Sequence, residues 1–471
     1  MMPAWLDAAL LAVVFAAVAL LIGVLASAHA LLYKRRPRAA FGWIAVCLTF
    51  PLAGAALYFW FGINRAQRRA RRLRDDEHVD FPPEHAAPPP CGYEALAQLG
   101  AAVTGEPLLG GHAVEPLHGG EHAYAAMLAA IDGAQQRVFL VTYIFDTDDT
   151  GRAFADALGR AVARGVDVRV LLDGVGELYS FPRARWMLRR QGVAVRRFLP
   201  PRLLPPSFMV NLRNHRKILL VDDGLAFSGG MNISDRHLVD RVDNPHRVVD
   251  VHFAIRGPSV VSLLSIFMSD WAFAGGVEPA KAAVACTAGE GRARVIADGP
   301  DEELDRLLLV LVGAIGLARQ RVAIMTPYFV PPRELLGALQ TAALRGVDVS
   351  ILLPGRSNLF FVHRATRHML WELLQRGVRV YYQPAPFVHS KLLLVDDGYA
   401  QIGSANLDPR SLRLNFELTL EIYDRPLVAQ LHEHYAAARA RAEEIHLADV
   451  DGRPLPTRLL DGLAWLFSPY L

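Results

Sequence analysis

The feature that most constrains the fold of this 471-residue chain is an internal repeat. Four segments recur in the same order, at offsets of 174 to 185 residues. The matching pairs are Gln136–Phe145 with Gln320–Phe329, Ala163–Gly174 with Leu344–Gly355, Arg190–Val195 with Gln375–Val380, and His215–Gly224 with His389–Gly398. Self-similarity over this length indicates that one domain-sized unit has been duplicated.

Each copy alternates short apolar, β-branched runs with helical stretches such as Gly151–Arg164 and Pro332–Arg345. Runs that are apolar at consecutive positions are typical of strands covered by helices on both faces. The sequence therefore predicts an α/β fold of two lobes, each an α/β/α sandwich, related by a pseudo-twofold axis. We place the first lobe at residues 93–290 and the second at residues 291–471.

Two long apolar runs, Ala8–Tyr33 and Ala39–Ile63, precede the repeat and contain no Asp, Glu, Lys or Arg. Each is longer than the roughly 20 residues that cross about 30 Å of hydrocarbon. We therefore predict a pair of transmembrane helices in an anchor of residues 1–74, with Pro51 bending the second helix. Residues 75–92 are charged and rich in proline, which is typical of a linker.

Basic residues flank the second apolar run, with four in Lys34–Arg38 and six in Arg65–Arg74. Two crossings would return the rest of the chain to the side of the N-terminus. The excess of six over four favours a cytoplasmic body under the positive-inside rule. A shallow hairpin with both basic clusters on one face of the membrane is the alternative.

Beyond residue 74 the chain carries 40 basic and 46 acidic residues. This slightly acidic balance argues against a nucleic-acid partner, whereas the basic anchor favours anionic lipid headgroups. The three cysteines, Cys47, Cys91 and Cys286, are far apart and have no metal-type spacing.

The chain has only four lysines, and two of them, Lys217 and Lys391, occupy the same repeated pattern. Each copy reads H-x-K-x4-D, followed after six residues by G-x-x-N. Positions two apart on a strand point the same way, so His and Lys project together from one face. The catalytic candidates are therefore His215, Lys217, Asp222, His389, Lys391 and Asp396.

The turns after these strands supply further candidates. "VDDG" favours a turn in which Asp222 and Asp396 accept backbone hydrogen bonds. The small residues of "GGMN" and "GSAN" let backbone N–H groups approach an anion, and asparagine adds a side-chain donor. The candidate phosphate-binding residues are Gly229, Gly230, Asn232, Gly403, Ser404 and Asn406.

Two such half-sites facing each other would surround one phosphodiester with two imidazoles and two ammonium groups. One neutral histidine can attack phosphorus while the other, protonated, gives its proton to the leaving oxygen. The lysines can stabilise charge on the non-bridging oxygens, so this chemistry needs no metal. We interpret Tyr143 and Tyr328, in the first pair of matching segments, as core residues.

The two motifs resemble those of the phospholipase D superfamily, and the whole chain resembles the bacterial cardiolipin synthases. The resemblance extends from the "RRPRAAFGWIAVCLTFPLAGAALYFWFG" segment through both motifs to the C-terminal "LLDGLAWLFSPYL". It implies that a phosphatidyl group passes from one phosphatidylglycerol to another, releasing glycerol, through a phosphohistidine and without metal or cofactor. It also implies a multi-pass protein of the bacterial cytoplasmic membrane, and it permits a homo-oligomer.

In this superfamily a carboxylate downstream of each motif orients the catalytic histidine. Glu417 matches that position well, and Asp250 is the best match in the first lobe, with seven extra residues intervening. The resemblance further implies that His215 is the nucleophile and His389 the general acid and base, with the reverse assignment left open. A membrane-anchored hydrolase of the same superfamily and a non-catalytic lipid-binding scaffold are the alternatives.

Overall fold

The structure, a computed structural model, describes residues 4–34, 37–62, 81, 85–201, 212–277, 287–300 and 305–468. The basic residues 65–74, half of the predicted linker 75–92, and Cys286 lie outside the described residues. Packing divides the chain into two units. Met1–Ala70 with Pro201–Met209 form the first, here called the anchor, and the remainder forms the second, here called the body.

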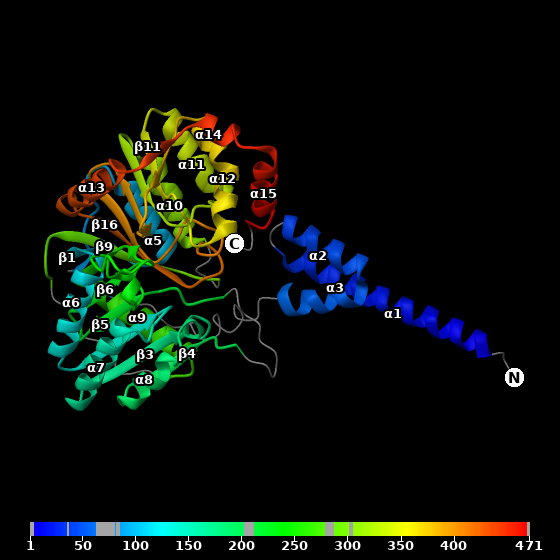
Figure 1. The fold of residues 1–471 in the computed structure, drawn as a ribbon, viewed down its shortest axis with the longest axis horizontal. Coiled ribbons are helices and arrows are strands. Elements are labelled where there is room, and N and C mark those ends of the chain that lie inside the picture. The colour runs from blue at the N-terminus through cyan, green and yellow to red at the C-terminus, as the bar shows by residue number, and fades with distance from the viewer. Residues whose placement is uncertain are drawn as a thin grey trace. The chain divides into compact units, whose positions relative to one another are not determined.

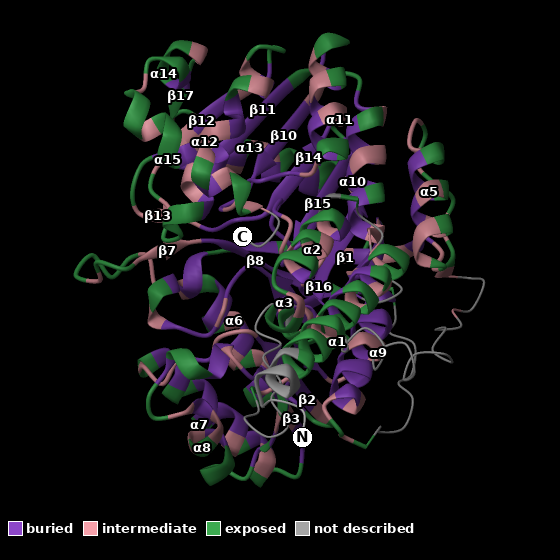
Figure 2. Ribbon diagram, turned by 90° about the vertical axis from the view of Figure 1, so that its right-hand side faces the viewer, coloured by how far each residue is buried: buried purple, intermediate pink, exposed green. Residues whose placement is uncertain are grey.

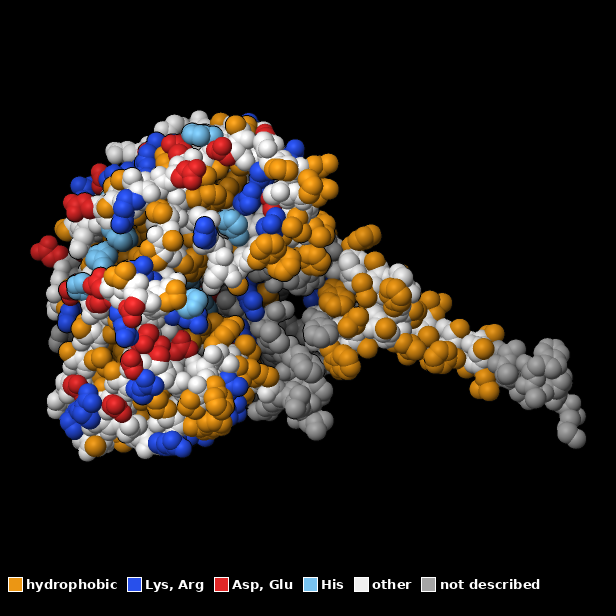
Figure 3. Space-filling model, in the orientation of Figure 1, with side chains coloured by type: hydrophobic (Ala, Val, Ile, Leu, Met, Phe, Trp, Pro, Cys, Tyr) orange, Lys and Arg blue, Asp and Glu red, His pale blue; other side chains and the backbone are white. Residues whose placement is uncertain are grey.

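The anchor contains α1 (Ala4–Tyr33), α2 (Pro37–Thr49), α3 (Pro51–Leu57) and a π-helical turn, η1 (Tyr58–Gly62). Figure 3 shows its surface covered by hydrophobic side chains. Within α1, Leu10–Tyr33 is long and apolar enough to cross a membrane. The 13 residues of α2 rise only about 20 Å at roughly 1.5 Å per residue, which is too short to cross.

The predicted bend at Pro51 is confirmed, and the second apolar run does not form one long helix. The backbone leaves the helical region at Phe50, with φ −127° and ψ 74°, and Pro51 begins a new helix. Proline has no N–H to continue the first helix, and it favours the first position of the next one. The second apolar run is therefore two short helices.

The first half of the body contains seven strands of four or more residues, in the order β1-β8-β6-β5-β2-β3-β4. Figure 1 labels β1, β6, β5, β3 and β4 among them. Their bounds are β1 Leu109–His118, β2 Arg137–Thr142, β3 Asp167–Asp173, β4 Ala194–Phe198, β5 Ile218–Val221, β6 Leu225–Gly229 and β8 Val251–Arg256. Strands β2, β3 and β4 are parallel to one another, and β5 joins β2 in the antiparallel sense.

The second half repeats this order as β9-β16-β15-β14-β10-β11-β12, and β17 adds a further strand at the edge. The bounds are β9 Gly291–Asp298, β10 Arg321–Met325, β11 Asp348–Pro354, β12 Arg379–Gln383, β14 Leu392–Val395, β15 Tyr399–Gly403, β16 Glu417–Tyr423 and β17 Glu443–Ile445. The predicted duplication is confirmed strand by strand. Antiparallel pairing of β1 with β9 joins the halves into one sheet, which the sequence did not predict.

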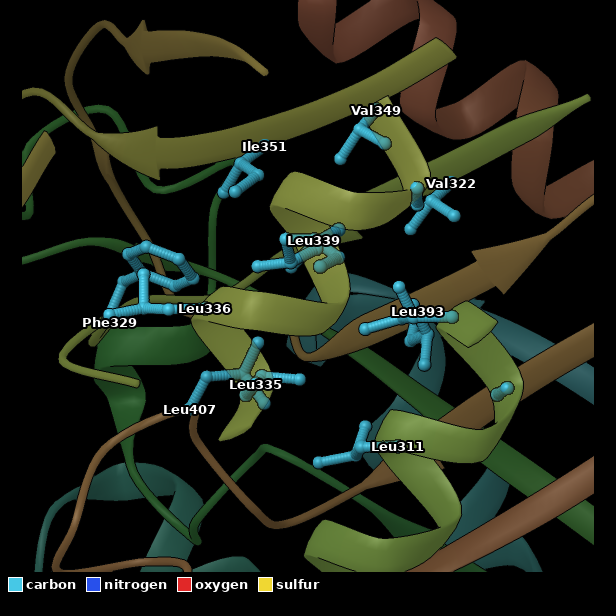
Figure 4. Close-up of a cluster of buried hydrophobic side chains, with 14 of the residues drawn as sticks. Leu311, Val322, Phe329, Leu335, Leu336, Leu339, Val349, Ile351, Leu393 and Leu407 are labelled. Carbon is cyan, nitrogen blue, oxygen red and sulfur yellow. The ribbon is translucent and has the colours of Figure 1, made fainter. Parts of the chain in front are cut away.

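Helices cover both faces of the sheet, as the apolar strands require (Figure 2). In the first lobe these are α6 (Gly119–Gly133), α7 (Asp149–Ala163), α8 (Ala184–Arg190) and α9 (Ser259–Phe273). In the second lobe they are α10 (Arg306–Leu317), α11 (Arg333–Leu344), α12 (Phe360–Leu374) and α13 (Arg425–Arg439), with α14 (Leu447–Asp451) and α15 (Leu455–Leu466) beyond them. Figure 4 shows leucines of α10 and α11, among them Leu311 and Leu339, packed on Val322 and Ile351 of the sheet.

One helix packs in the core of the second lobe, although its position in the sequence predicts the first lobe. Helix α5 (Glu94–Thr104) precedes β1, and the sequence placed it in the first lobe. Its residues Leu96 and Ala97 are buried in the core cluster of the second lobe. Residues near 93 therefore pack with the second lobe, which the linear boundary at 290 did not anticipate.

Candidate active site

The segments that carry the two histidines each pair with a strand of the opposite lobe. The backbone N–H of His215 donates to the carbonyl of Phe416 at 2.9 Å, and Asn214 and Phe416 form a parallel bridge. In the same way, the N–H of His389 donates to the carbonyl of Val249 at 2.7 Å. There β13 (Phe387–Val388) runs parallel to β7 (Val248–Val249). The two halves thus exchange equivalent backbone contacts.

This exchange places each carboxylate beside the histidine of the other lobe. Nδ1 of His215 lies 3.0 Å from Oε1 of Glu417. Nδ1 of His389 lies 2.9 Å from Oδ2 of Asp250. The residues that precede these carboxylates, Phe416 and Val249, are the ones that accept the histidine N–H groups. Both carboxylates named from the sequence therefore contact a histidine, and the contacts are crossed between lobes.

The seven extra residues before Asp250 do not displace it. The segment from 240 to 246 is mostly exposed, and β8 begins directly after Asp250, as β16 begins with Glu417. The additional length is absorbed in a surface turn. Loops of this kind accept insertions at little cost to the elements that they connect.

Burial makes the two carboxylate–imidazole pairs electrostatically different. Burial alone would raise the pKa of Glu417, but the nearby His215 and Lys217 lower it overall. The pKa of Asp250 is raised by burial, against the opposing influence of Lys391. The pKa values of both histidines are lowered by burial, that of His389 well below its usual range. Glu417 is the carboxylate held more firmly in its charged form.

Each lysine folds back toward the histidine two residues before it. Nζ of Lys217 donates to the carbonyl of His215 at 2.7 Å, and Nζ of Lys391 donates to the carbonyl of His389 at 2.6 Å. Lys391 also lies 2.9 Å from Nδ1 of His389. Burial lowers the pKa of Lys217 to about 7 and that of Lys391 to about 8. Anions that enter such a site meet cations without much competing solvent.

The small residues after β6 and β15 fit closely around the carboxylates. Gly403 has φ 153°, and a Cβ there would lie 2.2 Å from the carbonyl oxygen of Leu418. A Cβ on Gly230 would lie 2.4 Å from the carboxylate of Asp250. At the equivalent place in the second lobe, the hydroxyl of Ser404 donates to Glu417 at 2.5 Å. The tail of each motif therefore shapes the surroundings of its own lobe's carboxylate.

The motif asparagines hold neighbouring chain segments. Oδ1 of Asn232 accepts from the N–H of Ile144 at 3.1 Å, and Nδ2 of Asn406 donates to Ser411 at 3.2 Å. Their assignment to phosphate, like that of the glycines and Ser404, stays a prediction.

The motif aspartates are not brought to the histidines. Asp222 has φ 52° and accepts from the backbone N–H groups of Gln136 at 2.7 Å and Arg137 at 3.0 Å. Asp396 does the same at the start of β10. Each aspartate follows its lysine by five positions along a strand, a distance of roughly 16 Å at about 3.3 Å per residue. Their predicted role in the turn is confirmed, and their grouping with the catalytic candidates stays a prediction.

Two tyrosines that the sequence assigned to the core lie against the histidines. The ring centroids of Tyr143 and His215 are 5.2 Å apart, and those of Tyr328 and His389 are 6.1 Å apart. Nζ of Lys217 also lies 5.8 Å from the Tyr143 ring. The tyrosines are offset by one position between the matching segments, so the repeat alone did not single them out.

A buried ion pair and two buried hydrogen bonds hold the residues on either side of His215 in the first motif. Arg216 donates to Asp270 at 2.9 Å and to the carbonyl of Glu417 at 3.0 Å, and Asn214 donates to Asp270 at 2.8 Å.

In the described ranges no three His, Cys, Asp or Glu side chains gather as a metal site would require. The prediction of metal-free chemistry is not tested by that observation.

Comparison with known proteins assigns the family. The family model described as "Cardiolipin synthase, PLD-like domain" matches residues 127–264 and 311–438, together more than half of the chain. A cardiolipin synthase A of Pseudomonas putida (strain F1) is 36% identical over 472 residues, covering 96% of each chain. A cardiolipin synthase of Geobacillus thermodenitrificans is 33% identical, covering 93% of this chain and 90% of the relative.

Solved structures share the fold. Phosphatidylserine synthase from Haemophilus influenzae superposes with a TM-score of 0.60 at 16% identity, covering 87% of this chain and all of that one. At that identity the likeness concerns the fold, which agrees with two lobes sharing one sheet. With the family model matching both lobes and relatives matching nearly the whole length, the chain belongs to the cardiolipin synthase family.

Proposed function

We propose that this chain transfers a phosphatidyl group from one phosphatidylglycerol to the terminal glycerol hydroxyl of a second, giving cardiolipin and glycerol. The observation that carries the proposal is the pair of crossed contacts, His215 with Glu417 and His389 with Asp250. A buried lysine, Lys217 or Lys391, lies beside each histidine. Each imidazole contacts a carboxylate through Nδ1, and we assign Nε2 as the reacting atom of each ring; Nζ of Lys391 lies 3.2 Å from Nε2 of His389.

In the first step, Nε2 of His215 attacks the phosphorus of phosphatidylglycerol. The bond between phosphorus and the glycerol oxygen breaks, and His389 gives that oxygen a proton. In the second step, the hydroxyl of another phosphatidylglycerol loses its proton to His389 and attacks phosphorus. The phosphorus–nitrogen bond then breaks, and both histidines return to their initial state.

The assignment of the nucleophile to His215 is supported by the state of its carboxylate. Glu417 has a lowered pKa and so carries charge. A charged partner stabilises the imidazole as it gains positive character on bonding to phosphorus. Asp250, whose pKa is raised, suits a histidine that takes up and releases a proton.

The lysines link substrate binding to the protonation of His389. Lys391 and Lys217 both lower the pKa of His389 in the free protein. A bound phosphodiester offsets those positive charges and so raises the pKa of the imidazole. His389 would therefore acquire its proton when the substrate is in place.

Exposed aromatic residues in the segments that follow β3 and β11 support a lipid substrate. After β3, Tyr179 and Phe181 are 65% and 84% exposed, and the ring of Tyr179 lies 6.2 Å from that of Tyr143. At the corresponding place after β11, Phe360 and Phe361 are more than half exposed. Apolar side chains held in water beside a polar site suit acyl chains, and they suit closure of the site against hydrolysis.

We place the protein in the bacterial cytoplasmic membrane. The apolar helix Leu10–Tyr33 and the basic residues that follow it support this location.

The activity can be tested with the purified full-length chain and vesicles of phosphatidylglycerol, by resolving the lipid products. Cardiolipin and glycerol are expected, and neither should form with His215→Ala. Phosphatidic acid and glycerol would instead identify a hydrolase, and unchanged lipid would identify a scaffold.

A further inference from the structure

The second apolar run of the anchor folds back on itself. A Cβ on Gly54 of α3 would lie 2.3 Å from the carbonyl oxygen of Val46 in α2. Residues eight apart in a straight helix are about 12 Å apart, so the chain must reverse direction between them. The reversal occurs at Phe50 and Pro51, where the helical backbone is interrupted.

The run ends beside the place where it begins. Nζ of Lys34 donates to the carbonyl of Gly62, the last residue of η1, at 2.5 Å. His29 of α1 is hydrogen-bonded to the Tyr58 hydroxyl at 2.8 Å. Pro37, the first residue of α2, follows Lys34 by three positions. Entry and exit of the α2–α3–η1 segment therefore lie at the same end of α1, as Figure 1 shows within the anchor.

The tip of this hairpin reaches only part of the way along α1. A Cβ on Gly23 would lie 2.6 Å from the carbonyl oxygen of Cys47 and 3.0 Å from Pro51. Gly23 and Lys34 are eleven residues apart, which is about 16 Å along a helix. That length is about half of a 30 Å hydrocarbon layer.

The hairpin meets the requirements for a buried turn in lipid. The N–H of Phe50 donates to Val46 at 3.0 Å, and the N–H of Gly54 donates to Phe50 at 2.6 Å. Pro51 has no N–H to satisfy. The exposed side chains at the tip are Thr49, Phe50 and Leu52, of which two are large and apolar. Backbone polar groups at membrane depth must be satisfied within the protein, and these two hydrogen bonds satisfy the N–H groups of Phe50 and Gly54.

Aromatic residues lie in the half of the hairpin nearer its open end, and basic residues adjoin that end in the sequence. Tyr33 and Trp60 are exposed there, and Trp43 and Tyr58 pack with ring centroids 5.3 Å apart. The sequence supplies four basic residues in Lys34–Arg38 and six in Arg65–Arg74, all adjoining this end of the hairpin along the chain. Aromatic rings mark the membrane–water interface, and basic residues concentrate on the cytoplasmic side.

We propose that α1 crosses the bilayer once and that the α2–α3–η1 hairpin enters and leaves the cytoplasmic leaflet without crossing. The N-terminus then lies on the outer side and the body on the cytoplasmic side. All ten basic residues then adjoin the cytoplasmic face of the membrane, as the positive-inside rule favours. Two crossings would instead place four of them on one face and six on the other. The hairpin also widens the anchor within the leaflet from which the body takes its lipid. The proposal does not depend on the catalytic roles assigned above.

Cysteine labelling with a membrane-impermeant maleimide tests this topology. The full chain would carry Cys47→Ala and Cys286→Ser, leaving the exposed Cys91 of the body as the reporter. Further variants would lack Cys91 and carry Met2→Cys, Phe50→Cys or Leu25→Cys. Leu25 is an exposed residue of α1, nine residues before Lys34, and serves as the control for a site near the middle of the bilayer.

In right-side-out membrane vesicles Met2→Cys should be labelled and Cys91 protected, and in inside-out vesicles the reverse should hold. Phe50→Cys and Leu25→Cys should react only after denaturation in detergent. Labelling of Met2→Cys and Cys91 from the same side would overturn the single crossing. Labelling of Phe50→Cys in right-side-out vesicles would overturn the half-depth hairpin, and Cys91 labelled from outside would overturn the assignment of sides.

Discussion

Glu417, in the second lobe, holds the imidazole of His215, in the first, with Nδ1 and Oε1 3.0 Å apart. His389 and Asp250 make the reciprocal contact. Neither lobe alone contains a complete carboxylate–histidine pair, so each half of the duplication depends on the other for its chemistry. The shared sheet through β1 and β9 fixes the lobes in the register that these contacts require.

Glu417→Gln should retain the fold and lose most of the activity. Glutamine keeps the shape of the buried side chain but removes the charge that orients and stabilises His215. We expect cardiolipin formation to fall by about 10² to 10⁴-fold, the range that general acid–base groups contribute. The assay compares initial rates of purified proteins whose melting temperatures have been matched. Activity within a factor of about three of the parent would contradict the role of this contact.

Ser404→Gly gives the second lobe the residue that the first has at Gly230. It removes the 2.5 Å hydrogen bond that helps to keep Glu417 charged. The pKa of Glu417 should rise, so the acid limb of the kcat/KM profile should move to higher pH. A rate loss of about tenfold is expected for a lost hydrogen bond to a charged group. A lower rate with an unmoved acid limb would mean that Ser404 acts only on the fold.

Lys217→Arg should be severely impaired although the charge is kept. Lys217 is buried and bends back to the carbonyl of His215, a path that the longer, planar guanidinium cannot follow. The same substitution at Lys281, outside both motifs, provides the control. Equal turnover by the two variants would show that arginine can replace lysine at position 217.

Activity and stability should respond to alkaline pH in opposite directions. The pKa values of Lys217 and Lys391 in the folded protein are about 7 and about 8, whereas an unfolded lysine has a pKa of about 10.4. As pH rises from 7 toward 10, the folded protein binds fewer protons than the unfolded chain, so these lysines favour folding increasingly. Over the same range they lose the charge that binds phosphate, so kcat/KM should fall.

The measurement compares melting temperatures of the parent and Lys217→Met between pH 7 and pH 9.5. The parent should gain stability relative to the variant as pH rises. A difference that is constant with pH, or that changes in the other direction, would show that Lys217 titrates as an ordinary exposed lysine.

Phe181→Asp should weaken activity on vesicles while sparing activity on a short-chain, dispersed phosphatidylglycerol. Phe181 is 84% exposed on the loop next to Tyr179, where an aspartate would oppose contact with an anionic bilayer. Leu344→Asp, at an exposed position at the end of α11, is the matched control. Equal losses on both forms of substrate, or equal effects of the two substitutions, would exclude this loop as a lipid contact.

The sequence predicted the features that depend on local pattern and on repetition. The duplication, the strand-and-helix alternation and the His-x-Lys pairs all follow from short-range spacing, which the strands preserve. The crossed partners of Glu417 and Asp250 could not be predicted in this way, because they depend on how two distant segments pair across the junction. The resemblance named the carboxylates but not the lobe of the histidine that each contacts.

The remaining differences also arise from tertiary packing. Asp222 lies in the motif with Lys217, yet the direction of β5 carries it to the opposite end of the strand. The second apolar run has enough hydrophobic length for a span, and its reversal depends on Pro51 and on the close fit of Gly54 to Val46. Helix α5 packs on α10 because Leu96 and Ala97 complete an apolar surface distant in sequence.

The central claim is that both motifs act on one phosphorus atom, with His215 as the covalent nucleophile. Rapid quenching of the protein with phosphatidylglycerol, followed by proteolysis and mass spectrometry, tests it most directly. A phosphatidyl or phosphoryl adduct is predicted on the peptide that contains His215, and it should be absent from His215→Ala. An adduct found only on His389, or cardiolipin made at the parental rate by either single histidine variant, would contradict the account.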